Sequence, residues 1–181
     1  MKIKNLFLST ILALGLASQA IAFPTQPVKL VSQFPAGSAP DAGARRIADA
    51  LSKSFNTAVV VEPKPGGNGA VAMEYIINQP SDGHTVLIAS HDIQTSFPLL
   101  YNTTKYSDKI SPLVPIWKTD LFLVTSSKIQ TFNELVELSK VKPISYGSWG
   151  IGSISHIDSA RFAQQTGITA THVPYKDYGQ W

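Results

Sequence analysis

Cysteine is absent from this chain of 181 residues, and charged residues are scarce. Without cysteine the protein can form neither a disulfide framework nor a thiolate site, so its stability must come from a buried core. Only 15% of the residues are charged, against about 25% in an average soluble domain. The hydrophobic share of 44% is still enough to build a core, which excludes a wholly disordered chain.

A concentrated basic region is also missing. The formal net charge is +3, and the longest cluster of basic side chains is the pair Arg45-Arg46. A surface that binds nucleic acid or an anionic membrane needs a denser basic patch than this. The sequence therefore indicates no nucleic-acid partner.

The first 22 residues have the pattern of a cleavable secretory signal peptide. Lys2 and Lys4 supply positive charge, residues 6–17 form an uncharged apolar run, and residues 20–22 (Ala-Ile-Ala) are a small-x-small cleavage site. The apolar run is shorter than the ~20 residues that span a bilayer as a helix, so a retained membrane anchor is the weaker alternative. Cleavage would leave a mature chain that begins at Phe23 and has a net charge of +1.

Strand-like and helix-like segments alternate along the mature chain. Apolar and β-branched runs predict strands at residues 28–31, 58–61, 85–89, 144–146 and 169–173. Apolar residues at three- and four-residue steps, with capping signals, predict helices at residues 41–53, 70–78, 131–142 and 153–165. Such alternation is typical of an α/β fold with parallel strands and flanking helices.

Local signals support several of these boundaries. Asp41 stands where a helix favours a cap or a first-turn acid, and Thr131 with Glu134 forms a capping box. Gly167 is placed to end the last helix. Residues 63–69 are expected to form a loop, and residues 91–112 show no regular pattern.

Two Gly- and Ser-containing loops, residues 34–41 and 146–156, each join a strand to a helix. Each places glycine, serine and backbone N–H groups at the positive end of a helix, an arrangement suited to a carboxylate or phosphate. In open α/β sheets ligands bind at the carboxyl ends of the strands, where both loops would lie. The alternative is that the glycines only make tight turns.

Motifs of other function classes are weak or missing. Residues 67–72 fit G-x-G-x-x-A and Asp92 follows, but Pro63 and Pro65 make the loop too long for a dinucleotide site, so turn chemistry is the better interpretation. No G-x-S-x-G elbow occurs. The histidines, which lack metal-site spacing, are His84, His91, His156 and His172. No cofactor or metal is indicated, and His156 is singled out for its place after the Gly/Ser loop.

Several segments together carry a resemblance to one family. Residues 34–41 match F-P-P-G-G-x-x-D, residues 64–69 match a Pro- and Gly-rich stretch, and residues 80–88 match P-x-D-G-Y-T-L-L. Residues 146–157 match Y-A-S-x-G-x-G-S-x-x-H-L, and residues 172–176 match H-V-P-Y-K. In this order the motifs resemble the Bug family, the periplasmic substrate-binding proteins of tripartite tricarboxylate transporters.

The resemblance implies a type II periplasmic-binding-protein fold that closes around a small carboxylate. It implies a first lobe at residues 23–120, a partial second lobe at residues 121–181, and a boundary near residues 112–120. It also implies a periplasmic monomer, not an enzyme, that serves a membrane permease. The ligand-binding positions so implied are Phe34, Ala36, Gly37, Ser38, Asp41, Ser90, Ser148, Trp149, Gly150, Gly152, Ser153 and His156.

Departures from the family pattern give further expectations. Ser38 replaces a loop glycine and adds a hydroxyl, Trp149 stands where a small residue is usual, and Asp177 replaces a glycine. Family members also continue well beyond the Tyr175-Lys176 loop, so we expect a truncated product with impaired binding. A non-functional fragment is one alternative, and an exported Ser/His hydrolase using Ser148 or Ser153 is a weaker one.

Overall fold

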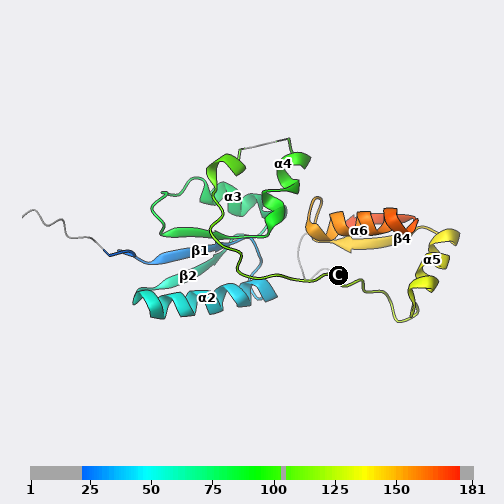
Figure 1. Ribbon diagram of the computed structural model, residues 1–181, viewed down its shortest axis with the longest axis horizontal. Coiled ribbons are helices and arrows are strands. Elements are labelled where there is room, and N and C mark those ends of the chain that lie inside the picture. Colours follow the sequence, from blue (N-terminus) through cyan, green and yellow to red (C-terminus); the bar gives the residue numbers. More distant parts are fainter. Residues whose placement is uncertain (1–21, 103–104, 176–181) are drawn as a thin grey trace, which may run out of the picture.

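The computed structural model describes residues 22–102 and 105–175. The expected signal peptide, apart from Ala22, and the expected role of Asp177 lie outside these residues. Figure 1 shows two groups of helices and strands joined by an extended segment. Within the described part of the chain, no helix has both the length and the apolar character needed to cross a membrane.

The first group is built on a parallel sheet of β1 (Val28–Ser32), β2 (Val59–Pro63) and β3 (Thr85–Ile88). The strand order is β2-β1-β3, and Leu30 of the central strand lies opposite Val61 on one side and Val86 on the other. Four of the five residues of β1 are buried, as expected for a central parallel strand covered on both faces. The predicted alternation of parallel strands and crossover helices is confirmed.

Helix α2 (Ala39–Phe55) packs against β1 and β2 and closes the main core. It begins two residues earlier than predicted because Ser38 is the N-cap, with its side chain accepting a hydrogen bond from the Asp41 N–H, and proline is tolerated in the first turn. Asp41 is the first-turn acid. The buried core residues are Val28, Leu30, Phe34, Ala44, Ala48, Val59, Val61 and Ile88.

The other side of the sheet carries α3 (Ala70–Ile76), opposite α2 in Figure 1. It follows a short 3₁₀ turn, η1 (Gly67–Gly69), that occupies part of the predicted loop. The expected irregular region instead contains the short helices η2 (His91–Ile93), α4 (Ser96–Leu100) and η3 (Ser107–Lys109). These fold because their side chains bury a second cluster, formed by Met73, Ile93, Phe97 and Tyr106.

Residues 111–124 run between the two groups without helix or strand, and every residue in this segment is exposed. One anchor is Trp117, whose ring lies beside that of Phe34 with 6.5 Å between centroids. The same indole contacts Gly43 of α2, where an added Cβ would lie 3.3 Å from it. The segment therefore touches the first group near the β1–α2 loop.

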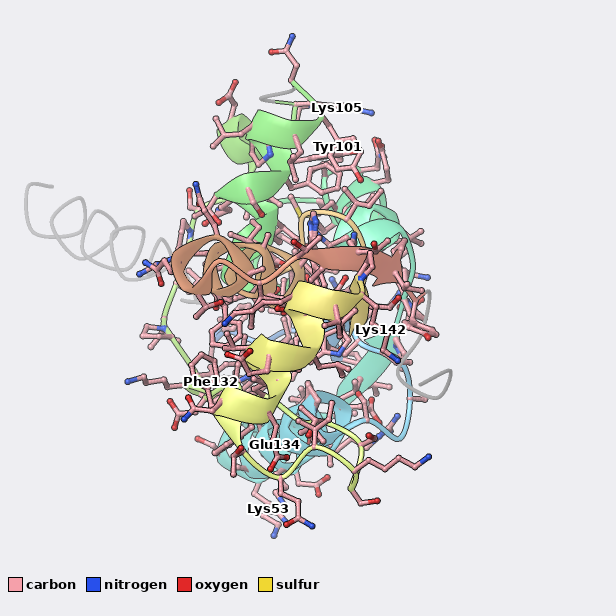
Figure 2. All side chains as sticks on the ribbon, turned by 90° about the vertical axis from the view of Figure 1, so that its right-hand side faces the viewer. Lys53, Tyr101, Lys105, Phe132, Glu134 and Lys142 are labelled. Atoms are coloured by element: carbon pink, nitrogen blue, oxygen red, sulfur yellow. The ribbon has the colours of Figure 1, made fainter. Side chains whose placement is uncertain are left out.

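The second group contains α5 (Phe132–Val141), β4 (Ile144–Ser148), α6 (Ile154–Thr166) and β5 (Ala170–Pro174). Strands β4 and β5 are parallel, with Tyr146 opposite His172. The predicted cap of α5 is confirmed, since the Glu134 N–H donates to Thr131 Oγ1 at 3.2 Å. Figure 2 shows Glu134 and Lys142 at opposite ends of α5, where their charges complement the helix dipole.

Candidate functional site

A cavity of about 210 Å³ lies at the carboxyl ends of the three strands of the first sheet and is also lined by one side chain from the second group. Its walls come from the segments that follow β1, β2 and β3 and from the loop after β4. Ligands of open α/β sheets bind at this edge. The lining residues are Gln33, Phe34, Pro35, Pro65, Gly66, Asn68, Gly69, Ser90, Asp92 and Trp149.

Three of the residues expected from the sequence, Phe34, Ser90 and Trp149, line this cavity together. Trp149 is one of the residues that depart from the family pattern, and it is the residue of the second loop that lines the cavity with Phe34 of the first. Sequence reasoning missed Gln33 and Asn68. The sequence offered little indication of either residue. Gln33 comes shortly after a predicted strand, and Asn68 lies in a stretch that was interpreted only as a turn.

The other residues of the first loop bond to one another. The Gly37 N–H donates to Asp41 Oδ2 at 2.9 Å, and the Ser38 hydroxyl donates to the Pro35 carbonyl at 2.7 Å. Ala36 is exposed. Asp41 is 2% exposed and accepts a hydrogen bond from Arg45 Nε at 2.9 Å. This network fixes the shape of the loop beside Phe34.

The second loop likewise satisfies its own N–H groups. The Gly152 N–H donates to His156 Nδ1 at 3.1 Å, and the Gly150 N–H donates to Ser148 Oγ at 3.2 Å. Ser153 caps α6 by accepting from the His156 N–H at 3.3 Å. The loop is thereby held in one shape at the helix N-terminus, with Trp149 facing the cavity.

A serine–histidine pair occurs in the second group. Ser148 Oγ lies 2.6 Å from His172 Nε2, and the His172 ring stacks on Tyr146 and on His156, at 5.1 and 3.9 Å between centroids. Burial, with a smaller contribution from His156, lowers the pKa of His172. Ser148 is nevertheless fully buried, so no substrate can reach its hydroxyl in this structure. The pair joins β4 to β5 and lends no support to the hydrolase alternative.

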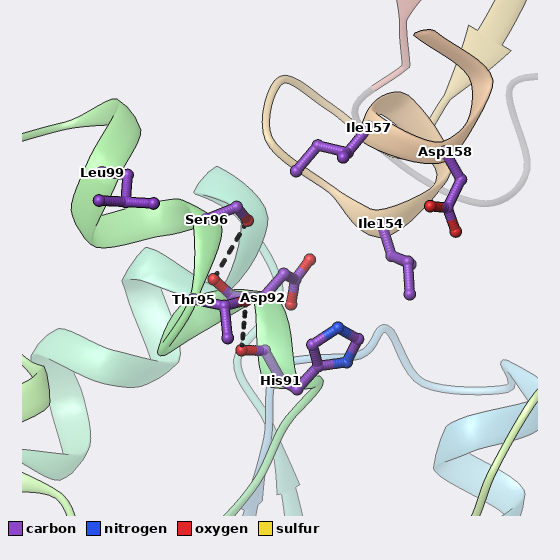
Figure 3. A pocket seen from close by; sticks show the side chains of 8 residues that line it. All are labelled: His91, Asp92, Thr95, Ser96, Leu99, Ile154, Ile157 and Asp158. Carbon is purple, nitrogen blue, oxygen red and sulfur yellow. Dashed lines mark hydrogen bonds between the residues drawn. The ribbon is translucent and has the colours of Figure 1, made fainter. Parts of the chain in front are cut away.

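A second hollow, of about 320 Å³, separates η2 and α4 from the start of α6 (Figure 3). The Ser96 hydroxyl donates to the Gly152 carbonyl at 2.7 Å beside it, which links the two groups. The wall of this hollow includes Leu99, which is 84% exposed, whereas Gly69 in the first cavity is buried; the buried Asp92 lines both. We therefore take the smaller, better enclosed cavity as the candidate site. Among the described residues, no three His, Asp or Glu side chains gather as metal ligands would.

The comparison with protein families decides the assignment. Residues 43–180 match the family described as the tripartite tricarboxylate transporter family receptor, TctC. The chain belongs to this family. The match covers the second group, the first group from within α2 onward without β1, and all of the cavity except the segment that follows β1.

Individual relatives of this TctC-family chain support the same family assignment. It is 30% identical over 163 residues to a UPF0065 protein of Bordetella bronchiseptica, which covers 88% of this chain and 49% of that protein. It is 26% identical over 174 residues to protein BugT of Bordetella pertussis, covering 91% and 53% respectively. The Bug resemblance is thus confirmed. The chain spans about half the length of the curated relatives it matches.

Solved structures show the same fold. A protein of R. palustris with adipate superimposes with a TM-score of 0.71 at 28% identity, covering 86% of this chain and 54% of that one. The α/β fold with parallel sheets is therefore that of the TctC-type periplasmic binding proteins. This fold and family are those of solute-binding proteins.

The buried carboxylate of this TctC-family chain makes its stability depend on pH. Burial alone would raise the pKa of Asp41, but hydrogen bonds from Arg45 and Gly37 outweigh it and hold that pKa below its ordinary value. A lowered folded-state pKa stabilises the fold above the ordinary aspartate pKa of about 4, and this contribution is lost as the pH falls through the folded-state value.

We expect Asp41→Asn to lower the free energy of unfolding at pH 7 by about 1–2 kcal/mol, with the half-exposed Arg45 discounted for solvent screening. The difference from the unsubstituted chain should shrink as the pH falls below about 4. Urea unfolding at pH 7 and pH 3 measures it. Asp49→Asn, at an exposed position of α2, is the control and should change little. A deficit that is equal at both pH values would contradict the assignment.

Proposed function

We propose that this chain carries the ligand site of a periplasmic receptor that captures a small carboxylate for a tripartite tricarboxylate-type transporter. The observation that carries the proposal is the cavity whose walls join both groups of elements, with Trp149 opposite Phe34 and Ser90. A relative with the same fold has been solved with adipate, a dicarboxylate. Membership of the TctC family supports the part of the proposal that concerns the transporter.

The size and chemistry of the cavity suit a small organic acid. At about 210 Å³ the cavity is smaller than the ~300–1,000 Å³ pockets that hold drug-sized ligands, which favours a small ligand. Among the residues that the structure describes, no lysine or arginine lines it. Hydrogen-bond donors would therefore recognise the carboxylate, helped by the positive ends of nearby helices.

The proposal divides the expected site residues by role. Phe34, Ser90 and Trp149 would contact the ligand directly. The others would hold the two loops in shape through the bonds described above: Ala36, Gly37, Ser38, Asp41, Ser148, Gly150, Gly152, Ser153 and His156. Residues 23–120 would form the first lobe and residues 121–181 part of the second.

The setting of the receptor follows from the same proposal. Residues 1–22 would direct export and be removed, which places the mature chain in the periplasm. Its partners would be the carboxylate and the permease subunits in the membrane. We propose that it acts as a monomer and needs no cofactor.

Binding is tested on the mature chain from Phe23 to Trp181 by thermal shift and calorimetry with di- and tricarboxylates. A ligand present at 100 times its Kd adds about 2.7 kcal/mol of stability, which should raise the Tm by about 5–10 °C. Trp149→Ala should weaken binding about tenfold, because the large aromatic side chain lining the cavity would be lost. Leu99→Ala, in the other hollow, is the control and should bind normally. A folded sample that responds to no acid would refute the proposal.

A further inference from the structure

One glycine of the second loop lies directly against a helix of the first group. The Gly152 carbonyl accepts a hydrogen bond from the Ser96 hydroxyl of α4 at 2.7 Å. A Cβ added at Gly152 would overlap Leu100 Cδ1 of the same helix, and it would lie 3.8 Å from Asn68 Nδ2 of η1. Glycine fits here because Leu100 occupies the space that a side chain would need, so the two groups of elements meet closely at this point.

The Ser96 hydroxyl has two acceptors for its single proton. The Gly152 carbonyl is the nearer, and the Asp92 carbonyl, four residues back along the chain, lies 3.3 Å away. Serine hydroxyls commonly bond a carbonyl at that spacing. If Gly152 moved away, the hydroxyl would therefore turn to Asp92 and no donor would be left unpaired. The bond between the groups can thus break and re-form at small cost.

Leu100 supplies apolar packing at the same point. Its side chain is about half exposed and fills the space beside Gly152, whereas its neighbour Leu99 is 84% exposed and lines the open hollow (Figure 3). Gly152 also has φ of +83°, a conformation that residues with a Cβ rarely adopt. Both its missing side chain and its backbone therefore fit this contact with α4.

The second loop transmits the position of Gly152 to the cavity. The Gly152 N–H donates to His156 Nδ1 at 3.1 Å, and the Trp149 N–H donates to Ser155 Oγ at 3.2 Å. These bonds tie both ends of residues 149–152 to the first turn of α6, so the loop and the helix move together. Holding Gly152 against α4 therefore holds Trp149 at the cavity that it lines.

We propose that Ser96, Leu100 and Gly152 form a contact that keeps the two groups together and positions Trp149 at the candidate site before any ligand binds. The three residues act by positioning, because none of them lines the cavity. Breaking the contact lowers the fraction of molecules with an assembled site, so every ligand loses affinity by the same factor. The effect on affinity rests on the proposed function, whereas the effect on the arrangement of the two groups does not.

The ligand-free protein provides the first test. The chain has no cysteine, so spin labels attach only at introduced ones: Asp49→Cys on α2 and Gln164→Cys on α6, both at exposed positions. Gly152→Ala should broaden the distribution of distances between the labels, because the methyl group displaces Leu100. An unchanged distribution would overturn the inference, whether or not any acid binds.

Gly167→Ala is the matched control for the backbone cost. Gly167 has φ of +70°, and an added Cβ there meets nothing within 4 Å. It ends α6 at the far side from the second loop. Gly167→Ala should therefore leave the label distances as they are in the unsubstituted protein. If it broadens them as much as Gly152→Ala does, backbone strain and not the contact with Leu100 is responsible, and the inference is wrong.

Calorimetry with succinate, adipate and citrate provides the second test. Gly152→Ala should weaken each acid that binds by at least about tenfold, and Leu100→Ala by about threefold. The double variant should bind no more weakly than Gly152→Ala alone, because the overlap disappears with the Leu100 side chain. Losses that multiply to about thirtyfold would show that the two residues act independently, against the proposal. Leu99→Ala should bind normally.

Ser96→Ala and Ser96→Thr test the hydrogen bond. Alanine removes the donor and should weaken every acid by about threefold, whereas threonine keeps the hydroxyl and should stay within about twofold of the unsubstituted protein. A loss confined to one acid would mean that Ser96 contacts the ligand, and would contradict its positioning role. If none of the acids binds the unsubstituted protein, the proposed function fails, and the label distances still decide whether the contact holds the groups together.

Discussion

Replacing Gly69 by alanine should lower the free energy of unfolding by about 3 kcal/mol. Gly69 has φ of +93°, a conformation that costs a residue with a Cβ about 1–2 kcal/mol. The new methyl group would also meet Ile93 Cγ2 at 2.8 Å and Gln33 Oε1 at 2.9 Å. Ile93 is 4% exposed and has little room to move, so overpacking adds a further ~1–3 kcal/mol.

Gly37→Ala separates the two causes. Gly37 has φ of +80°, but an added Cβ there meets nothing within 4 Å, so only the backbone cost applies. Urea unfolding of the two variants should show Gly69→Ala less stable than Gly37→Ala by at least about 1 kcal/mol. An equal loss of unfolding free energy in the two variants would mean that the residues around Gly69 can move to admit a methyl group, and that packing does not hold Gln33 in place.

Gly69 also shows how much of the candidate site can be predicted from the sequence. Residues 67–72 fit a dinucleotide motif by spacing, and the long Pro-containing loop before them favoured turn chemistry instead. The structure places positive φ at Gly67, Asn68 and Gly69, in keeping with a turn. Spacing alone could not reveal that this turn forms the wall of a cavity, because that depends on Gln33 and Ile93, which come from other segments.

Regular elements were the predictable part. The central strand at residues 28–31, the Thr131 side-chain cap of α5 and the helix end at Gly167 all depend on local chemistry, and all are present. The other half of the expected capping box differs, since the Glu134 carboxylate accepts from the Gln130 N–H. The short helices of residues 91–109 were missed, because they depend on burial of Phe97 and Tyr106 against a helix more than twenty positions away. Local propensity carries no information about such contacts.

The candidate site was predictable in the same uneven way. Phe34, Ser90 and Trp149 were expected and line one cavity. The loop glycines and serines were expected to offer free donors, but their bonds run within each loop, as those of Gly37 and Gly152 show. The sequence shows which residue types follow a strand. The hydrogen-bond partners of those residues depend on how the loop folds, which the sequence pattern does not show.

Met73→Ala should cost about 3 kcal/mol, within the ~2–5 kcal/mol typical of such truncations in a core. Met73 is 1% exposed and belongs to the cluster of Ile93, Phe97 and Tyr106, so a smaller side chain leaves a cavity that these neighbours can fill only in part. Val71→Ala on the same helix, 48% exposed, is the matched control and should cost less than about 0.5 kcal/mol.

The same substitution should weaken ligand binding, because the cluster holds the turn that carries Asp92 of the candidate site. Ile93 follows Asp92 directly, and Asp92 fixes Ser90 and through it the Gln33 amide. Loosening Met73 should therefore lower the affinity for the carboxylate, whereas Val71→Ala should not. A Met73→Ala protein that is destabilised yet binds as tightly as before would show that the Asp92–Ser90–Gln33 chain keeps its geometry without the packing beneath it.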